Sequence, residues 1–112
     1  MHEHGIADHV YRALTEEMRR RGATRVVSAT VHVGEFSGIT EEVLRDGLKH
    51  CAEHEGVEPF EVTVIVEGPR ARCTQCGAEE PLGDRMACGA CGSEGIEVVP
   101  ATGVVIGEVE FA

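Results

Sequence analysis

Two Cys-x-x-Cys-Gly units carry the strongest chemical signal in this sequence. Cys73 and Cys76 form the first, Cys88 and Cys91 form the second, and eleven residues (77–87) separate them. A Cys-x-x-Cys unit bends the chain so that two thiolates meet one cation, and two such units complete a tetrahedral sulfur shell. The spacing therefore predicts a zinc site with these four cysteines as ligands. Because four sulfurs leave no open position, we expect the zinc to be structural and not catalytic.

A redox dithiol or a pair of disulfides would use the same residue type. A redox site needs a single Cys-x-x-Cys, usually at the start of a helix, whereas this chain has two, without helical periodicity around them. The glycine that follows each unit, Gly77 or Gly92, agrees with zinc binding. The turn that aims backbone N–H groups at the sulfurs often needs a positive φ, which glycine adopts without a Cβ penalty.

The first residues form a second candidate metal site. His2 and His4 flank Glu3 beside the amine of Met1. A terminal amine has a pKa near 7.7–8.0 in model peptides, so a useful fraction is unprotonated near neutrality. With an imidazole and deprotonated backbone amides it offers a planar nitrogen ring, which suits Ni(II) or Cu(II) and not tetrahedral zinc. From the residues alone, a frayed terminus with surface histidines, or the end of an expression tag, explains the same pattern equally well.

Hydrophobic periodicity predicts two helices. Ile6, Val10, Leu14 and Met18 recur every four residues, and Gly22 suits the end of that helix. In the second helix Thr40 is a suitable N-cap, acidic residues occupy the first turn and Gly56 suits the end. Leu44, Leu48 and Cys51 share its apolar stripe, so Cys51 is expected to be a small buried hydrophobe. His50 and His54 are four residues apart and could share a metal, but they lie off that stripe.

Alternating residues predict three strands, at Arg25–Gly34, Phe60–Glu67 and Val104–Phe111. The expected fold is α+β, a three-stranded sheet with two helices plus an inserted rubredoxin-like or zinc-ribbon module. Residues 1–69 and 101–112 would form the α/β domain and residues 70–100 the zinc-binding module. A short strand at Ile96–Val99 fits either part. The glycine-rich break at residues 34–38 is expected to be a loop.

The composition of the chain disfavours some classes of function and indicates where the protein is located. The 112-residue chain has 20 acidic and 10 basic residues and a net charge of −10, so it would repel phosphate backbones. One Tyr and three Phe offer little base stacking, so nucleic-acid binding is disfavoured. Five cysteines, four of them assigned to metal, favour a reducing compartment. With no apolar run long enough to span a bilayer and no signal peptide, a cytoplasmic location without membrane association is expected.

Several motifs occur together in the order of a known family. They are Met1-His2-Glu3, Gly22-Ala23-x-Arg25-Val26-Val27, Gly34-Glu35-Phe36-Ser37-Gly38 and the two cysteine units. Over essentially the whole chain, the sequence resembles the HypA/HybF family of nickel-insertion accessory proteins for [NiFe]-hydrogenase. The resemblance implies that His2 is the essential nickel ligand, that neighbouring backbone nitrogens help and that Glu3 acts beside it. It also implies structural zinc on the four cysteines.

The expected function is that of a nickel metallochaperone and not of an enzyme. The resemblance implies delivery with a HypB-type GTPase to a hydrogenase large subunit, with urease as a second client. A homodimer is conceivable because Gly68-Pro69 could act as a swapping hinge. The alternative is a zinc-ribbon adaptor without a nickel role. An enzyme using Glu35 and Ser37 is disfavoured, since no histidine lies near them in sequence to act as a base.

Overall fold

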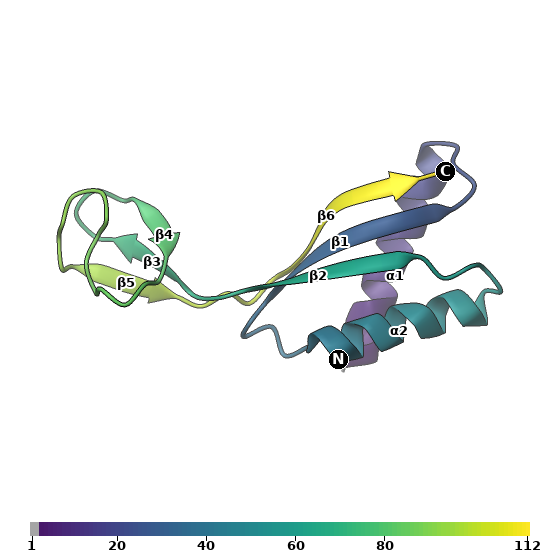
Figure 1. Cartoon of the computed structure of the whole chain (residues 1–112), viewed down its shortest axis with the longest axis horizontal. Coiled ribbons are helices and arrows are strands. Elements are labelled where there is room, and N and C mark those ends of the chain that lie inside the picture. The colour runs from purple at the N-terminus through teal and green to yellow at the C-terminus, as the bar shows by residue number, and fades with distance from the viewer. Residues whose placement is uncertain (1–2) are drawn as a thin grey trace.

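The structure is a computed structural model that describes residues 3–112, with side chains from Gly5 onward. It consists of two bodies joined by two chain segments, with overall extents of 54 × 28 × 20 Å (Figure 1). The larger body holds two helices, α1 (Glu3–Arg20) and α2 (Glu41–His54), and three strands, β1 (Val26–Gly34), β2 (Glu61–Glu67) and β6 (Val104–Phe111). The smaller body holds β3 (Arg70–Cys73), β4 (Glu79–Pro81) and β5 (Ile96–Val99).

The larger sheet has the strand order β2-β1-β6. β1 pairs with β2 in parallel and with β6 antiparallel. A parallel pair needs a crossover connection, and α2 supplies it between β1 and β2. Both helices lie on one face of this sheet (Figure 1). The predicted α+β class, the two helices and the three strands are confirmed, with strand ends within one residue of those expected.

The core fills the space between the helices and the sheet. Alternate residues of β1 point into it, and Leu14, Leu44 and Leu48 from the helices are 1% exposed or less. The two helices approach closely where Gly47 of α2 meets Ala7 of α1, since a Cβ on Gly47 would overlap the Ala7 methyl. The amphipathic repeats read from the sequence therefore face a common interior.

The predicted helix ends are also confirmed. The side chain of Thr40 accepts a hydrogen bond from the N–H of Val43 at 3.2 Å, as an N-cap does. Gly22 and Gly56 follow the two helices with φ of 69°. This left-handed conformation closes a helix at little cost when the residue is glycine.

The smaller sheet has the order β4-β3-β5, and both pairs are antiparallel. The strand expected at Ile96–Val99 is present and belongs to this sheet, whereas β3 and β4 were not predicted. The sheets agree with the proposed division into residues 1–69 with 101–112 and residues 70–100, although those boundaries stay a prediction.

The loop after β1 holds both segments that connect the two bodies. The N–H of Glu35 donates to the carbonyl of Glu67 at 2.8 Å, and the N–H of Phe36 donates to the carbonyl of Ala101 at 2.9 Å. The N–H of Gly34 donates to Gly103 at 2.8 Å. Across the described residues, no helix has the length and apolar character needed to cross a membrane.

Candidate metal centre

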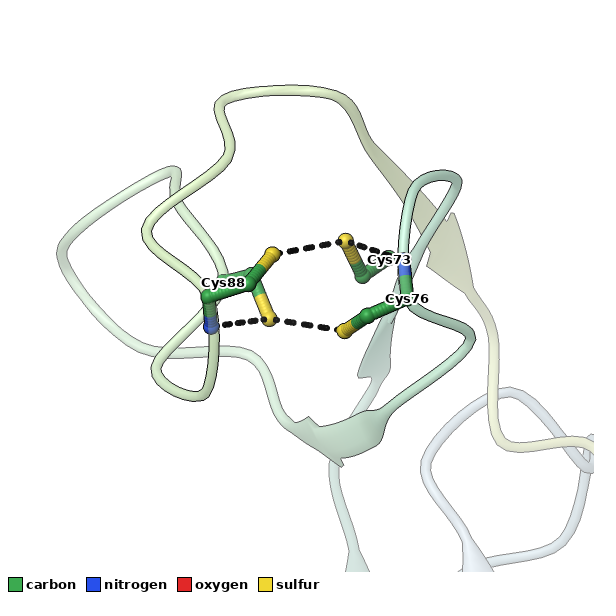
Figure 2. Close-up of side chains that lie close together, drawn as sticks. Cys73, Cys76 and Cys88 are labelled. Carbon is green, nitrogen blue, oxygen red and sulfur yellow. Dashed lines mark hydrogen bonds between the residues drawn. The ribbon is translucent and has the colours of Figure 1, made fainter.

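The four predicted cysteine ligands meet at one point in the smaller body (Figure 2). Their Sγ atoms all lie within 4.8 Å of one another. The Sγ atoms of Cys73 and Cys91 are 3.6 Å apart, as are those of Cys76 and Cys88. A tetrahedral zinc with bonds of about 2.3 Å places its sulfurs about 3.8 Å apart. The donor set therefore fits a structural zinc ion.

The sulfur spacing is too long for a disulfide. An S–S bond is about 2.05 Å long, and all five cysteines of the chain are free thiols in the structure. The pairs that approach most closely also join the two units to each other, because Cys73 faces Cys91 and Cys76 faces Cys88. One ion between the four sulfurs would connect both units at once.

Each unit builds the same turn around its first sulfur. The N–H groups of Gln75 and Cys76 lie 3.3 and 3.4 Å from the sulfur of Cys73. In the second unit, the N–H groups of Ala90 and Cys91 each lie 3.4 Å from the sulfur of Cys88. These donors stabilise negative charge on sulfur.

The pKa of Cys73 shows the effect of this turn. The backbone N–H groups of Cys76 and Gln75 lower it to about 6. The following glycines, Gly77 and Gly92, both have φ of 77°, as the sequence predicted. Thiolate is the form that binds metal, so the local backbone prepares the sulfur for its role.

Hydrogen bonds outside the cysteines hold the two units in place. The carboxylate of Glu80 on β4 accepts the N–H of Gly89 at 2.7 Å, which ties the second unit to the small sheet. The hydroxyl of Thr74 donates to the carbonyl of Gly95 at 2.7 Å. Nothing in the sequence pattern distinguished Glu80 from the chain's other acidic residues, because its role depends on the pairing of β3 with β4.

The structure does not describe the side chains of the proposed nickel ligands. Met1 and His2 lie outside the described residues, and so does the side chain of Glu3. The described part of the chain begins with α1 at Glu3, so the candidate nickel site would immediately precede a helix that packs on α2. The structure leaves this prediction untested.

Cys51, His50 and His54 are found around one cavity. The thiol of Cys51 is half-buried between the helices and donates to the Asp8 carboxylate at 3.0 Å. His50 and His54 are exposed and line the same cavity. The expectation of a small buried hydrophobe at Cys51 misses this polar contact, because the apolar stripe of α2 gave no information about which residue of α1 would face it.

His32 lies on the sheet face opposite the helices. Its Nδ1 is 2.7 Å from the Glu67 carboxylate on the neighbouring strand.

Comparison with known proteins gives a consistent result. A family model described as "Hydrogenase/urease nickel incorporation, metallochaperone, hypA" matches residues 1–111. The hydrogenase maturation factor HypA of Azorhizobium caulinodans is 30% identical over 111 residues, which is 98% of each chain. That of Thermococcus kodakarensis is 24% identical over 133 residues, covering 99% of this chain and 96% of the relative.

Two solution structures share the fold. One, of a HypA protein, has a TM-score of 0.73 and covers 100% of this chain and 97% of its own. The other, of the nickel metallochaperone HypA from Helicobacter pylori, has a TM-score of 0.66 and covers 99% and 97%. Both are 17% identical to this chain, so they inform the fold alone.

Proposed function

The chain belongs to the HypA family of hydrogenase and urease nickel-incorporation metallochaperones, and we propose that it carries Ni(II) on its first residues, Met1, His2 and Glu3. The observation that carries this proposal is the family match, which begins at residue 1 and so includes His2 and Glu3. The cysteine centre supports it indirectly. Its four sulfurs suit a retained ion, so a transferable ion needs a different site.

Nickel is the cargo of this site and not a resident cofactor. The unprotonated amine of Met1, the imidazole of His2 and adjacent backbone nitrogens would supply nitrogen donors in the planar arrangement that Ni(II) accepts. Glu3 lies beside them and begins α1. Ligands at the end of a chain can leave the metal one at a time, so a competing ligand set can remove the ion without unfolding the protein.

The proposed role is transfer and not catalysis. We infer that a HypB-type GTPase and a hydrogenase large subunit are the partners, with urease as a second client, because the family's role is nickel incorporation into these enzymes. Free cysteines at a zinc-type site favour the cytoplasm, where thiols stay reduced. We also propose that the chain forms a homodimer, with Gly68-Pro69 as the swapping hinge.

The test is a Ni(II) titration of zinc-loaded protein that begins at Met1 without a tag and carries Cys51→Ser, so that no thiol outside the four-cysteine cluster can bind nickel. We expect about one equivalent of nickel to bind near neutral pH with nitrogen and oxygen ligands in the X-ray absorption spectrum. His2→Ala, or one additional residue before Met1, should abolish this binding and leave zinc in place. His9→Ala is the matched control, since His9 is an exposed histidine further along α1. Equal nickel uptake by the Cys51→Ser protein and by both proteins altered at the N-terminus would contradict the terminal site and leave a zinc-ribbon adaptor as the better interpretation.

A further inference from the structure

A cavity of about 480 Å³ lies between α1 and α2, and none of its described lining residues belongs to either metal site discussed above. Besides Glu55, which accepts a hydrogen bond from Tyr11, four of its lining residues carry groups that bind transition metals. They are Asp8 from α1 and His50, Cys51 and His54 from α2. No part of the proposed nickel transfer uses these side chains.

Thiol and carboxylate already meet in this cavity. The sulfur of Cys51 lies 3.0 Å from an Asp8 oxygen, across the interface between the helices. His54 is three residues beyond Cys51, and His50 is four residues before His54, so one side of α2 carries all three groups. The contact between Asp8 and Cys51 therefore joins two donors from different helices, and the i, i+4 histidine pair lines the same cavity.

We propose that this cavity binds a second divalent transition-metal ion through the sulfur of Cys51, the carboxylate of Asp8 and the imidazoles of His50 and His54. Thiolate and imidazole together select borderline ions such as zinc, cobalt and nickel over magnesium or calcium, which prefer oxygen. This site goes beyond the proposed function and does not depend on the terminal amine.

The imidazoles must move to complete the site. Among the side chains that the structure describes, from Gly5 onward, the only group with three or more ligand atoms inside 4.8 Å is the four-cysteine cluster. His50 and His54 are exposed, and exposed side chains change rotamer within nanoseconds. The ion would thus draw the histidines toward a pair of donors that is already in contact.

The charges around the cavity are balanced, so they do not by themselves attract a cation. Arg12 and Arg19 line it together with Asp8 and Glu55, and the hydroxyl of Tyr11 donates to Glu55 at 3.4 Å. Affinity must therefore come from coordination bonds, and the bond to sulfur is the strongest candidate. This makes Cys51 the residue on which the proposal can be tested most sharply.

Coordination at Cys51 exchanges a proton for a metal. Burial, followed by the hydrogen bond to Asp8, raises the pKa of the thiol to about 11, so it is protonated near neutrality. Binding breaks the S–H bond, forms a sulfur–metal bond and releases one proton to solvent for each ion bound. Oxidation state does not change in this step.

The experiment uses the full chain, loaded with one equivalent of zinc for the four-cysteine centre and carrying His2→Ala to remove the proposed terminal site. Titration with Ni(II) should produce a thiolate-to-nickel absorption band in the near ultraviolet at about one equivalent, with zinc content unchanged. Cys51→Ser should abolish the band, and His50→Ala or His54→Ala should weaken binding by about tenfold or more. His9→Ala is the control, because His9 is exposed on α1 and does not line the cavity.

Two results would overturn the proposal. One is the absence of the band in folded, zinc-loaded protein. The other is a band that persists in Cys51→Ser, which would assign it to the four zinc-type cysteines. Thermal melts of each variant establish that it is folded before titration. Because the His2→Ala background lacks the terminal ligand, neither result bears on nickel binding by the chain end.

Discussion

Gly47 of α2 lies against Ala7 of α1, and the two helices approach so closely there that a methyl group on Gly47 would overlap that of Ala7. Gly47 is also an interior helix position, where glycine costs about 1 kcal/mol relative to alanine. Its presence there agrees with a requirement for close packing between the helices.

We expect Gly47→Ala to lower the free energy of unfolding despite its better helix propensity. Overpacking typically costs about 1–3 kcal/mol, which exceeds the gain of about 1 kcal/mol from alanine over most of that range. The thermal midpoint should fall by several degrees in a calorimetric melt. The double variant with Ala7→Gly and Gly47→Ala is the control, because it keeps one methyl group at the crossing. If Gly47→Ala alone raised the midpoint, the close approach would be wrong.

The cysteine centre predicts that Cys73→Ser or Cys91→Ser weakens zinc retention. Loss of one of four sulfurs leaves an incomplete shell, so release of zinc to a chelator should accelerate by at least about tenfold, as even losses in the surrounding shell reach that size. A chromophoric chelator measures the release directly. His9→Ala is the control, since His9 is exposed on α1 in the other body. Unchanged zinc content and release in the two test variants would contradict the four-sulfur assignment.

Glu80 should act as a positioning residue for the second cysteine unit. Glu80→Gln replaces a charged acceptor of the Gly89 N–H with a weaker neutral one, so zinc release should be faster by a factor below about tenfold. Glu94→Gln serves as the control, because Glu94 is exposed and no side-chain hydrogen bond to a cysteine unit is found for it among the described residues. Equal release rates in both variants would show that the Glu80 contact has no effect on the ion.

We expect the absence of a side chain at Gly34 to be required for close packing between β1 and residues 101–103, the segment that returns from the smaller body. A Cβ there would overlap the carbonyl of Ala101 and lie 2.8 Å from the N–H nitrogen of Thr102. Gly34→Ala should therefore disrupt the hydrogen bond from Gly34 to Gly103 and raise hydrogen exchange at the neighbouring amides. Gly83→Ala is the control, since a Cβ at Gly83 meets no atom within 4 Å. Unaltered exchange in Gly34→Ala would contradict tight packing at this junction.

The raised pKa of Cys51 has consequences for reactivity and for stability. With the pKa raised from 9.0 to about 11, alkylation at pH 8 should be about tenfold slower than in the urea-unfolded chain. The thiolate fraction falls by about a hundredfold, and the greater nucleophilicity of a more basic thiolate offsets part of that loss. Mass spectrometry of zinc-loaded protein resolves this site from the other cysteines.

The raised pKa of Cys51 also determines how its contribution to the free energy of unfolding depends on pH. The folded state keeps the proton to higher pH than the unfolded state, so this contribution is intact below about pH 9 and is lost between about 9 and 11. Asp8→Asn should lower the pKa of Cys51 and speed alkylation, because a charge that opposes the thiolate is removed. Alkylation as fast as in the unfolded chain would contradict the buried, hydrogen-bonded thiol.

The parts of the fold that could be predicted from the sequence depend on local information. The cysteine units could be predicted to bind a metal because both the type of ligand and the ligand spacing are visible within a few residues of sequence. The two helices could be predicted because their apolar residues repeat at the helical period over several turns. Thr40 and Gly56 added chemical signals at the helix ends, which the structure confirms.

The missed elements depend on contacts between distant residues. β3 and β4 are only four and three residues long and are rich in charge, so no alternation marks them. They form because the cysteine units bring their chain segments together as antiparallel partners. The polar setting of Cys51 was missed for the same reason, since Asp8 lies 43 residues away in sequence.

The small body leaves the larger sheet after β2 and returns at β6, so residues 68–103 form a single excursion from one end of that sheet (Figure 1). The cost of closing such a loop depends only logarithmically on its length. If chelation removed the ion and melted this excursion, β2 and β6 would still be joined by the same covalent path, with little added entropy loss. Because the metal-binding module is an insertion, the helix-covered sheet does not need the metal ion to stay folded. A metal-stripped chain should therefore keep its larger body folded, while residues 70–99 become an unfolded, protease-sensitive segment.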